Sequence, residues 1–196
     1  MSAPDQACHD LLVRLAGRLP DDLLWRLRDW LADGGRAALS ATLPRELLRH
    51  RVGLTDDERD LLVASVGEWG AQRRLLDTIL PSHGPDELFF TFEAVPDGLD
   101  PAALSLAAVV RGHPGCVELR QSRRTGGRGR QRVVLVSGGE RPWVLTGVLQ
   151  RVLRAHGDRT PCVEVLPPHG EPPAYHQAVI IGSASLWHSP AELVGA

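Results

Sequence analysis

Hydrophobic residues in the first part of the chain recur at the spacing of amphipathic helices. In the segment 21–35, leucines stand at Leu23, Leu27 and Leu31, and a pair of glycines follows at which a helix can end. This spacing places the leucines in one apolar stripe along the helix. We therefore expect short helices that pack together through such stripes.

Two local signals predict where these helices begin. Thr55 precedes an apolar run and Glu58 lies three residues later, so each side chain can accept a hydrogen bond from the other residue's backbone N–H. Pro20 and Pro44 each precede a leucine-rich stretch, and proline is favoured in the first turn because its missing N–H costs nothing there. Residues 1–81 are therefore expected to form an all-α domain.

The pattern changes after this domain. The segment 82–86 contains serine, glycine and proline and predicts a linker. The segments 87–95 and 132–139 are rich in aromatic or β-branched residues and end near turn residues, so both predict strands. Each of these strands leads into a predicted helix, the first over 101–111 and the second over 142–156.

The second part of the chain contains a short internal repeat. Its first predicted helix ends in RGHPGCVELR and its second in RAHGDRTPCVEVL, so His113 matches His156. The tripeptide CVE that begins at Cys116 likewise matches the one that begins at Cys162. A strand, a helix and another strand thus occur twice in succession. Two such units in tandem build a ferredoxin-like βαββαβ sandwich.

The predicted fold class is therefore α+β. The N-terminal all-α helical domain is followed, over residues 87–196, by a ferredoxin-like α/β sandwich with an extra C-terminal strand at 176–185. In the ferredoxin-like order, the strands that carry Cys116 and Cys162 lie on opposite edges of the sheet. Alternation along each strand turns the valine of CVE toward the helices and leaves Cys and Glu on an open face of the sheet.

Composition changes this picture mainly by exclusion. The chain has 196 residues and a net charge of −2; all 22 of its basic residues are arginine, and asparagine is absent. Codon bias in a high-GC genome accounts for such a composition. The absence of lysine excludes P-loop ATPases, Schiff-base enzymes and Ser–Lys hydrolases. The absence of asparagine excludes Cys–His–Asn sites and the kinase catalytic loop.

Cysteine usage and hydropathy bear on the compartment. The three cysteines, Cys8, Cys116 and Cys162, are too scattered for a disulfide framework. The sequence does not open on a cationic leader with an apolar run, and no apolar stretch approaches the roughly 18 residues of a membrane helix. We therefore expect a cytoplasmic protein with no membrane partner.

The most distinctive charged segment is RQSRRTGGRGRQR, residues 120–132, which links two predicted strands. One hypothesis makes it a solvated hairpin whose arginines discourage pairing with other strands. The other makes it a basic arm on nucleic-acid phosphates, although the strand 132–139 lacks the aromatic residues on which bases stack. The candidate anion or nucleic-acid contacts are Arg120, Arg123, Arg124, Arg128, Arg130 and Arg132.

The histidines do not assemble a reactive site. His113 and His156 fall at predicted helix C-termini, where an imidazolium interacts favourably with the helix dipole. His169, His176 and His188 have no spacing typical of a metal site. The sequence thus predicts no catalytic residue, no cofactor and no metal.

These observations favour a non-catalytic bacterial interaction or regulatory protein of the adaptor type. It would act through protein–protein contacts of its helical domain and of the open sheet face, with a protein partner or a second copy of the chain. The first alternative is a nucleic-acid-binding protein that uses the basic hairpin. The second alternative is an enzyme with a cysteine or histidine site between the domains.

Overall fold

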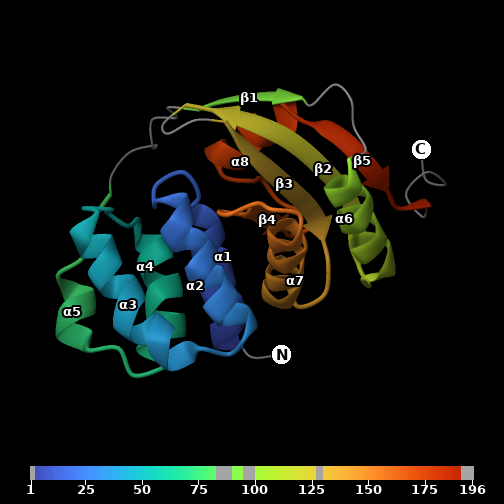
Figure 1. Cartoon of the computed structure of the whole chain (residues 1–196). Coiled ribbons are helices and arrows are strands. Elements are labelled where there is room, and N and C mark those ends of the chain that lie inside the picture. Colours follow the sequence, from blue (N-terminus) through green and yellow to red (C-terminus); the bar gives the residue numbers. More distant parts are fainter. Residues whose placement is uncertain (1–2, 83–89, 95–99, 127–129, 191–196) are drawn as a thin grey trace. The chain divides into compact units, whose positions relative to one another are not determined.

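The computed structural model describes residues 3–82, 90–94, 100–126 and 130–190. The chain divides into two compact units, Met1–Asp86 and Glu87–Ala196 (Figure 1). The predicted linker 82–86 lies almost entirely outside the described residues. Within the described ranges, no helix is both long and apolar enough to cross a membrane.

The first unit is helical, as the hydrophobic spacing predicts. Leu27, Leu43 and Leu62 are fully buried and belong to the apolar faces of three different helices. The fourth helix continues into a π-helical turn, in which Ser65 Oγ donates to the carbonyl of Leu61 at 2.7 Å. The elements are α1 (Ala3–Arg14), α2 (Asp21–Ala32), α3 (Arg36–Arg49), α4 (Asp56–Leu62), η1 (Val63–Gly67) and α5 (Arg73–Asp77).

The predicted capping box at the start of α4 is confirmed. The Glu58 amide donates to Thr55 Oγ1 at 3.3 Å, and the Thr55 amide donates to Glu58 Oε2 at 3.0 Å. The second carboxylate oxygen of Glu58 accepts from Arg18 Nη1 at 2.6 Å, and Arg18 also donates to the carbonyl of Gly53. This largely buried carboxylate therefore joins α4 to the segment that follows α1.

The predicted helix start at Pro44 is wrong. Pro44 lies inside α3, which begins at Arg36, where Nε and Nη2 of the arginine donate to the carboxylate of Asp5 at 2.9 and 2.6 Å. Proline in a helix interior removes one backbone hydrogen bond. Leu43 and Leu47 on either side of it are fully buried, and this burial offsets the loss.

The second unit is a mixed five-stranded sheet interleaved with helices (Figure 1). The α+β class is therefore confirmed: helices come first, and strands and helices then alternate. The elements are β1 (Thr91–Ala94), α6 (Pro101–Gly112), β2 (Cys116–Thr125), β3 (Gln131–Gly138), α7 (Pro142–Ala155), β4 (Cys162–Leu166), α8 (Ala174–Ile181) and β5 (Ala184–His188).

The strand order differs from the ferredoxin-like order that the repeat predicts. The order is β1-β2-β3-β4, and β5 also pairs with β2. β2 and β4 both flank β3, so Cys116 and Cys162 do not lie on opposite edges of the sheet. β2 and β3 pair with each other as an antiparallel hairpin. The connection through α7 then brings β4 to the other side of β3, where the two strands pair directly. β1 and β5 follow one another along the other side of β2.

The helices α6 and α7 cover one face of this sheet with an apolar core. Leu119, Val134 and Val163 contribute to that core from three strands. On β4, the predicted alternation is confirmed, because Glu164 points to the opposite face. On β2, it is wrong: a register shift between Cys116 and Glu118 turns Cys116 into the apolar core.

The opposite face is not open, because α8 packs against it. We predicted a strand over 176–185, but most of that segment is α8, and β5 starts only at Ala184. The apolar run of α8 is too short to distinguish a helix from a strand by periodicity, and Pro173 immediately before it suits a helix start. Ser122 Oγ donates to the carbonyl of Gly182 at 2.7 Å, which ties the end of α8 to β2.

Candidate functional site

The arginines of the predicted basic hairpin divide between the two faces of the sheet. Arg120 faces α8 and is held by its surroundings: Nη1 donates to Glu118 Oε1 at 2.6 Å and Nε donates to Ser183 Oγ at 2.8 Å. A weaker contact at 3.4 Å joins Nη2 to the carbonyl of Ile180. The hydrogen bonds of Arg120 therefore connect β2 to the segment between α8 and β5.

Arg124 is buried on the same face as Arg120. Only 5% of its surface is exposed, and Nη1 donates to the hydroxyl of Tyr175 at 3.1 Å. Its guanidinium also lies 4.5 Å from the ring centre of Phe90, in a cation–π contact. Burial raises the pKa of Tyr175 well above its usual value, so this phenol stays neutral. Arg124 cannot reach an external phosphate from this position.

Arg132 lies on the face of α6 and α7 and pairs with Asp100. Its Nη1 donates to one carboxylate oxygen at 3.2 Å, and its Nη2 donates to the other. Asp100 is also the N-cap of α6 and accepts from the amide of Ala103 at 2.8 Å. The hydrogen bonds from Arg132 lower the pKa of Asp100, so the carboxylate remains ionised and balances the arginine.

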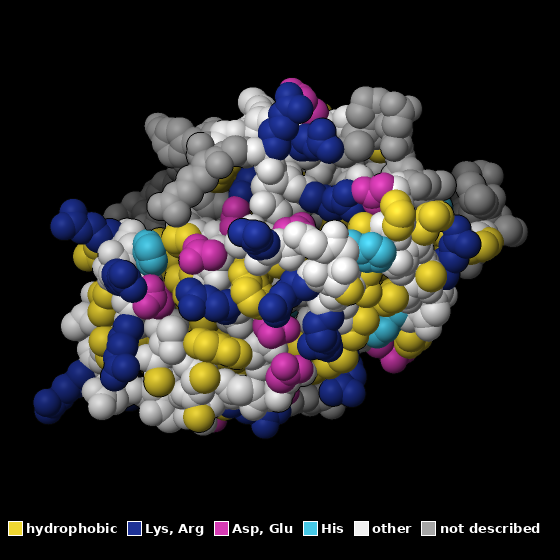
Figure 2. All heavy atoms as spheres, in the orientation of Figure 1, with side chains coloured by type: hydrophobic (Ala, Val, Ile, Leu, Met, Phe, Trp, Pro, Cys, Tyr) yellow, Lys and Arg dark blue, Asp and Glu magenta, His cyan; other side chains and the backbone are white. Residues whose placement is uncertain are grey.

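The other candidate arginines lie near the hairpin tip. Arg123 and Arg130 are exposed, and Arg128 lies outside the described residues. Three of the six candidates, Arg120, Arg124 and Arg132, are thus engaged within the fold. On the face that Figure 2 shows, arginine side chains are interspersed with acidic and hydrophobic ones. Sequence reasoning missed the three internal pairings because Asp100, Tyr175 and Ser183 are remote in sequence.

A polar pair that sequence reasoning did not identify is buried beneath α8. Glu164 Oε2 and His176 Nε2 are 2.9 Å apart, and the two side chains are 1% and 0% exposed. The ring of Tyr175 packs edge-on against the imidazole of His176 at 5.2 Å between centroids. Because solvent does not reach this pair, a substrate cannot reach it either. The arrangement fits a structural bond between α8 and β4.

The cysteines do not form a reactive centre. All three are free and buried. Burial raises the pKa of Cys8 far above that of an ordinary thiol and raises the pKa of Cys116 to about 11, so both stay protonated at neutral pH. Among the residues that the structure describes, no three His, Cys, Asp or Glu side chains are grouped so that they could hold a metal ion.

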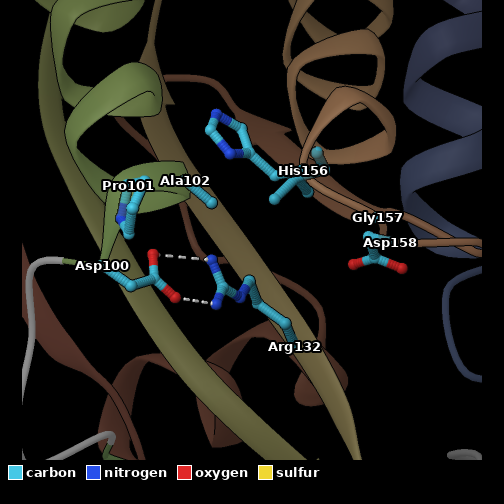
Figure 3. Close-up of a pocket in the computed structure, with 8 residues that line it drawn as sticks. Asp100, Pro101, Ala102, Arg132, His156, Gly157 and Asp158 are labelled. Carbon is cyan, nitrogen blue, oxygen red and sulfur yellow. Dashed lines mark hydrogen bonds and ion pairs between the residues drawn. The ribbon is translucent and has the colours of Figure 1, made fainter.

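A pocket of about 410 Å³ opens between the first turn of α6 and the last turn of α7 (Figure 3). The Asp100–Arg132 pair forms one wall, and Asp158 lies on the opposite side. His156 extends from the end of α7 toward α6, where its Nε2 lies 3.0 Å from Ser105 Oγ. The lining also includes the apolar residue Leu153.

His113, the repeat partner of His156, has a different environment. Its Nε2 lies 2.7 Å from the carbonyl oxygen of Glu140, in the turn between β3 and α7. Both histidines are the C-cap residues of their helices, as predicted. The repeat therefore places two histidines at equivalent helix ends, but only His156 borders the pocket.

No family model matches this chain, and searches of curated proteins and of solved structures likewise find no match.

Proposed function

We propose that this is a non-catalytic interaction protein that binds a second protein chain through the exposed sheet edge formed by β1 and β5. The observation that supports the proposal is that the outer sides of β1 and β5 are not paired with another strand of the described chain. Within the described residues, β1 and β5 each pair only with β2, so the outer side of each strand keeps its backbone N–H and C=O groups free of other strands.

The side chains of β5 provide little protection against pairing. Edge strands commonly carry lysine, proline or inward-pointing charges that prevent strand addition. β5 has the sequence ASLWH, with Ser185 and His188 exposed, and contains none of these. Ile181, which precedes β5 by three residues, is 87% exposed and offers an apolar contact beside it. Such an edge suits recognition by β-strand addition.

A second copy of the chain is the occupant that can be tested directly. We expect sedimentation velocity to show a concentration-dependent dimer, and Ser185→Lys to weaken it at least about tenfold, because a desolvated ammonium disfavours strand pairing. Ala155→Lys adds the same charge at an exposed position on α7 and should leave the dimer intact. A wild-type chain that stays monomeric up to about 1 mM would exclude self-pairing at any useful affinity.

Nucleic-acid binding is the second candidate function, favoured only by the exposure of Arg123 and Arg130. These are the two exposed arginines among the described residues of the hairpin, and two arginines neutralise few phosphates, so we expect no complex tighter than about 10 micromolar at physiological salt. Fluorescence anisotropy with labelled single-stranded and double-stranded DNA measures this affinity. A submicromolar complex that is lost in Arg123→Ser/Arg130→Ser would overturn the proposal of an interaction protein and favour this alternative.

A further inference from the structure

The pocket between α6 and α7 has the size and lining of a small-molecule site. Its volume of about 410 Å³ lies within the range of ligand pockets, which runs from about 300 to 1,000 Å³. Leu153, Pro101 and Ala102 supply apolar surface, and charged groups stand at both sides (Figure 3). Apolar surface with a few polar groups is the usual composition of such sites.

The charges of the pocket do not cancel. Asp100 and Arg132 neutralise one another through two hydrogen bonds, so this wall contributes little net charge. Asp158 uses one carboxylate oxygen to accept from the amide of Thr160 at 3.1 Å. In the part of the chain that the structure describes, it forms no ion pair. The negative end of the α7 dipole lies beside it and adds to its field. The pocket therefore carries an uncompensated negative charge.

His156 borders the same space. Ser105 Oγ lies 2.9 Å from the carbonyl oxygen of Pro101 and 3.0 Å from Nε2 of His156, so it connects the end of α7 to the first turns of α6. The histidine lies over the space that Asp100 and Arg132 border (Figure 3).

We propose that this pocket binds a small organic cation, namely a primary amine with a short apolar chain. The ammonium group would donate to the free carboxylate oxygen of Asp158, and the apolar chain would lie against Leu153. An ammonium has three donors and no acceptor, which matches the charge and the acceptor oxygen of this carboxylate. An anion would be repelled by Asp158 and would gain little from Arg132, because Asp100 already neutralises that arginine.

Titration of the protein with n-butylammonium, followed by ¹H–¹⁵N NMR, tests this proposal. We expect saturable shifts of the amides at 100–103 and 156–158, with a dissociation constant on the order of 1–10 mM for so small a ligand. Butyrate, which has the same chain length and the opposite charge, should cause no saturable shift there. Equal binding of butyrate, or no saturable shift with the amine, would overturn the proposal.

Variants separate the pocket from non-specific charge. Asp158→Asn retains an oxygen that can accept from Thr160, and it should weaken amine binding at least about tenfold because the charge-assisted bond is lost. Asp57→Asn removes a carboxylate that is 83% exposed and outside the pocket, and it should change nothing. If Asp158→Asn fails to fold, Asp158→Ser provides the test, since its hydroxyl can also accept from Thr160 and carries no charge. Unchanged amine affinity in the folded variant would contradict the proposed site.

Discussion

Replacing Glu58 with alanine is expected to lower the free energy of unfolding of the helical unit by about 3 kcal/mol or more. One carboxylate oxygen of Glu58 accepts from Arg18 at 2.6 Å, and the other closes the capping box with Thr55. The side chains of Arg18 and Glu58 are only 11% and 7% exposed. The variant would remove the carboxylate that pairs with the largely buried guanidinium of Arg18, and it would also remove half of the helix cap.

Urea unfolding followed by hydrogen exchange in peptides of the first unit measures this effect. Asp57→Ala is the matched control, because Asp57 stands in the same first turn of α4 but its side chain is 83% exposed. The control should lower the free energy of unfolding by less than about 1 kcal/mol, because Asp57 contributes only an exposed charge near the positive end of the helix dipole. Equal losses in the two variants would mean that the buried pair with Arg18 contributes nothing beyond the general effect of charge at this helix end.

Elements whose signals are local could be predicted from the sequence. The capping box needs only Thr55 and Glu58, three residues apart, and both of its hydrogen bonds form. The helices α6 and α7 begin at Pro101 and Pro142, as predicted, because proline at the first helical position is a local preference. Strand order depends instead on which distant segments meet, and an internal repeat does not determine that.

For the arginine segment, too, the sequence predicts the local structure but not which side chains are available to a ligand. Its residues identify a hairpin, and β2 and β3 do pair across it. Alternation alone divides the arginines between two faces, with Arg124 on one and Arg123 on the other. Whether each arginine is available depends on partners elsewhere: Tyr175 comes from α8 and Asp100 from the start of α6. Charge counted along the sequence therefore overstated the basic surface that a ligand could contact.

The pocket had no sequence signal for a related reason. Asp100 and Asp158 are separated by most of the second unit and come together only because α6 and α7 pack side by side on one face of the sheet (Figure 1). His156 was correctly assigned to a helix C-terminus, but the cavity beside it arises from how α6 is placed. A pocket assembled from helix ends can thus be found only once the packing is known.

The buried pair of Glu164 and His176 should be worth more as a pair than either residue is alone. Replacing Glu164 with leucine removes the carboxylate that lies 2.9 Å from Nε2 of the fully buried His176, and replacing His176 with leucine removes the imidazole from beside the buried carboxylate. Each single variant should lower the free energy of unfolding of the second unit by about 3 kcal/mol. The double variant, with apolar side chains of similar volume, should lose less than either single variant, because neither member of the pair is left buried without the other.

A double-mutant cycle measured by urea unfolding, with hydrogen exchange reporting on β4 and α8, tests this prediction. Glu140→Leu serves as the control, since Glu140 is exposed in the turn before α7 and its replacement should change stability by less than about 0.5 kcal/mol. A coupling energy of about 2 kcal/mol or more between Glu164 and His176 would identify their contact as the bond that fixes α8 on the sheet. If the losses of the two single variants simply added in the double variant, the pair would be two independent buried groups. The position of α8 would then rest on its apolar contacts and on Arg124 and Ser122 instead.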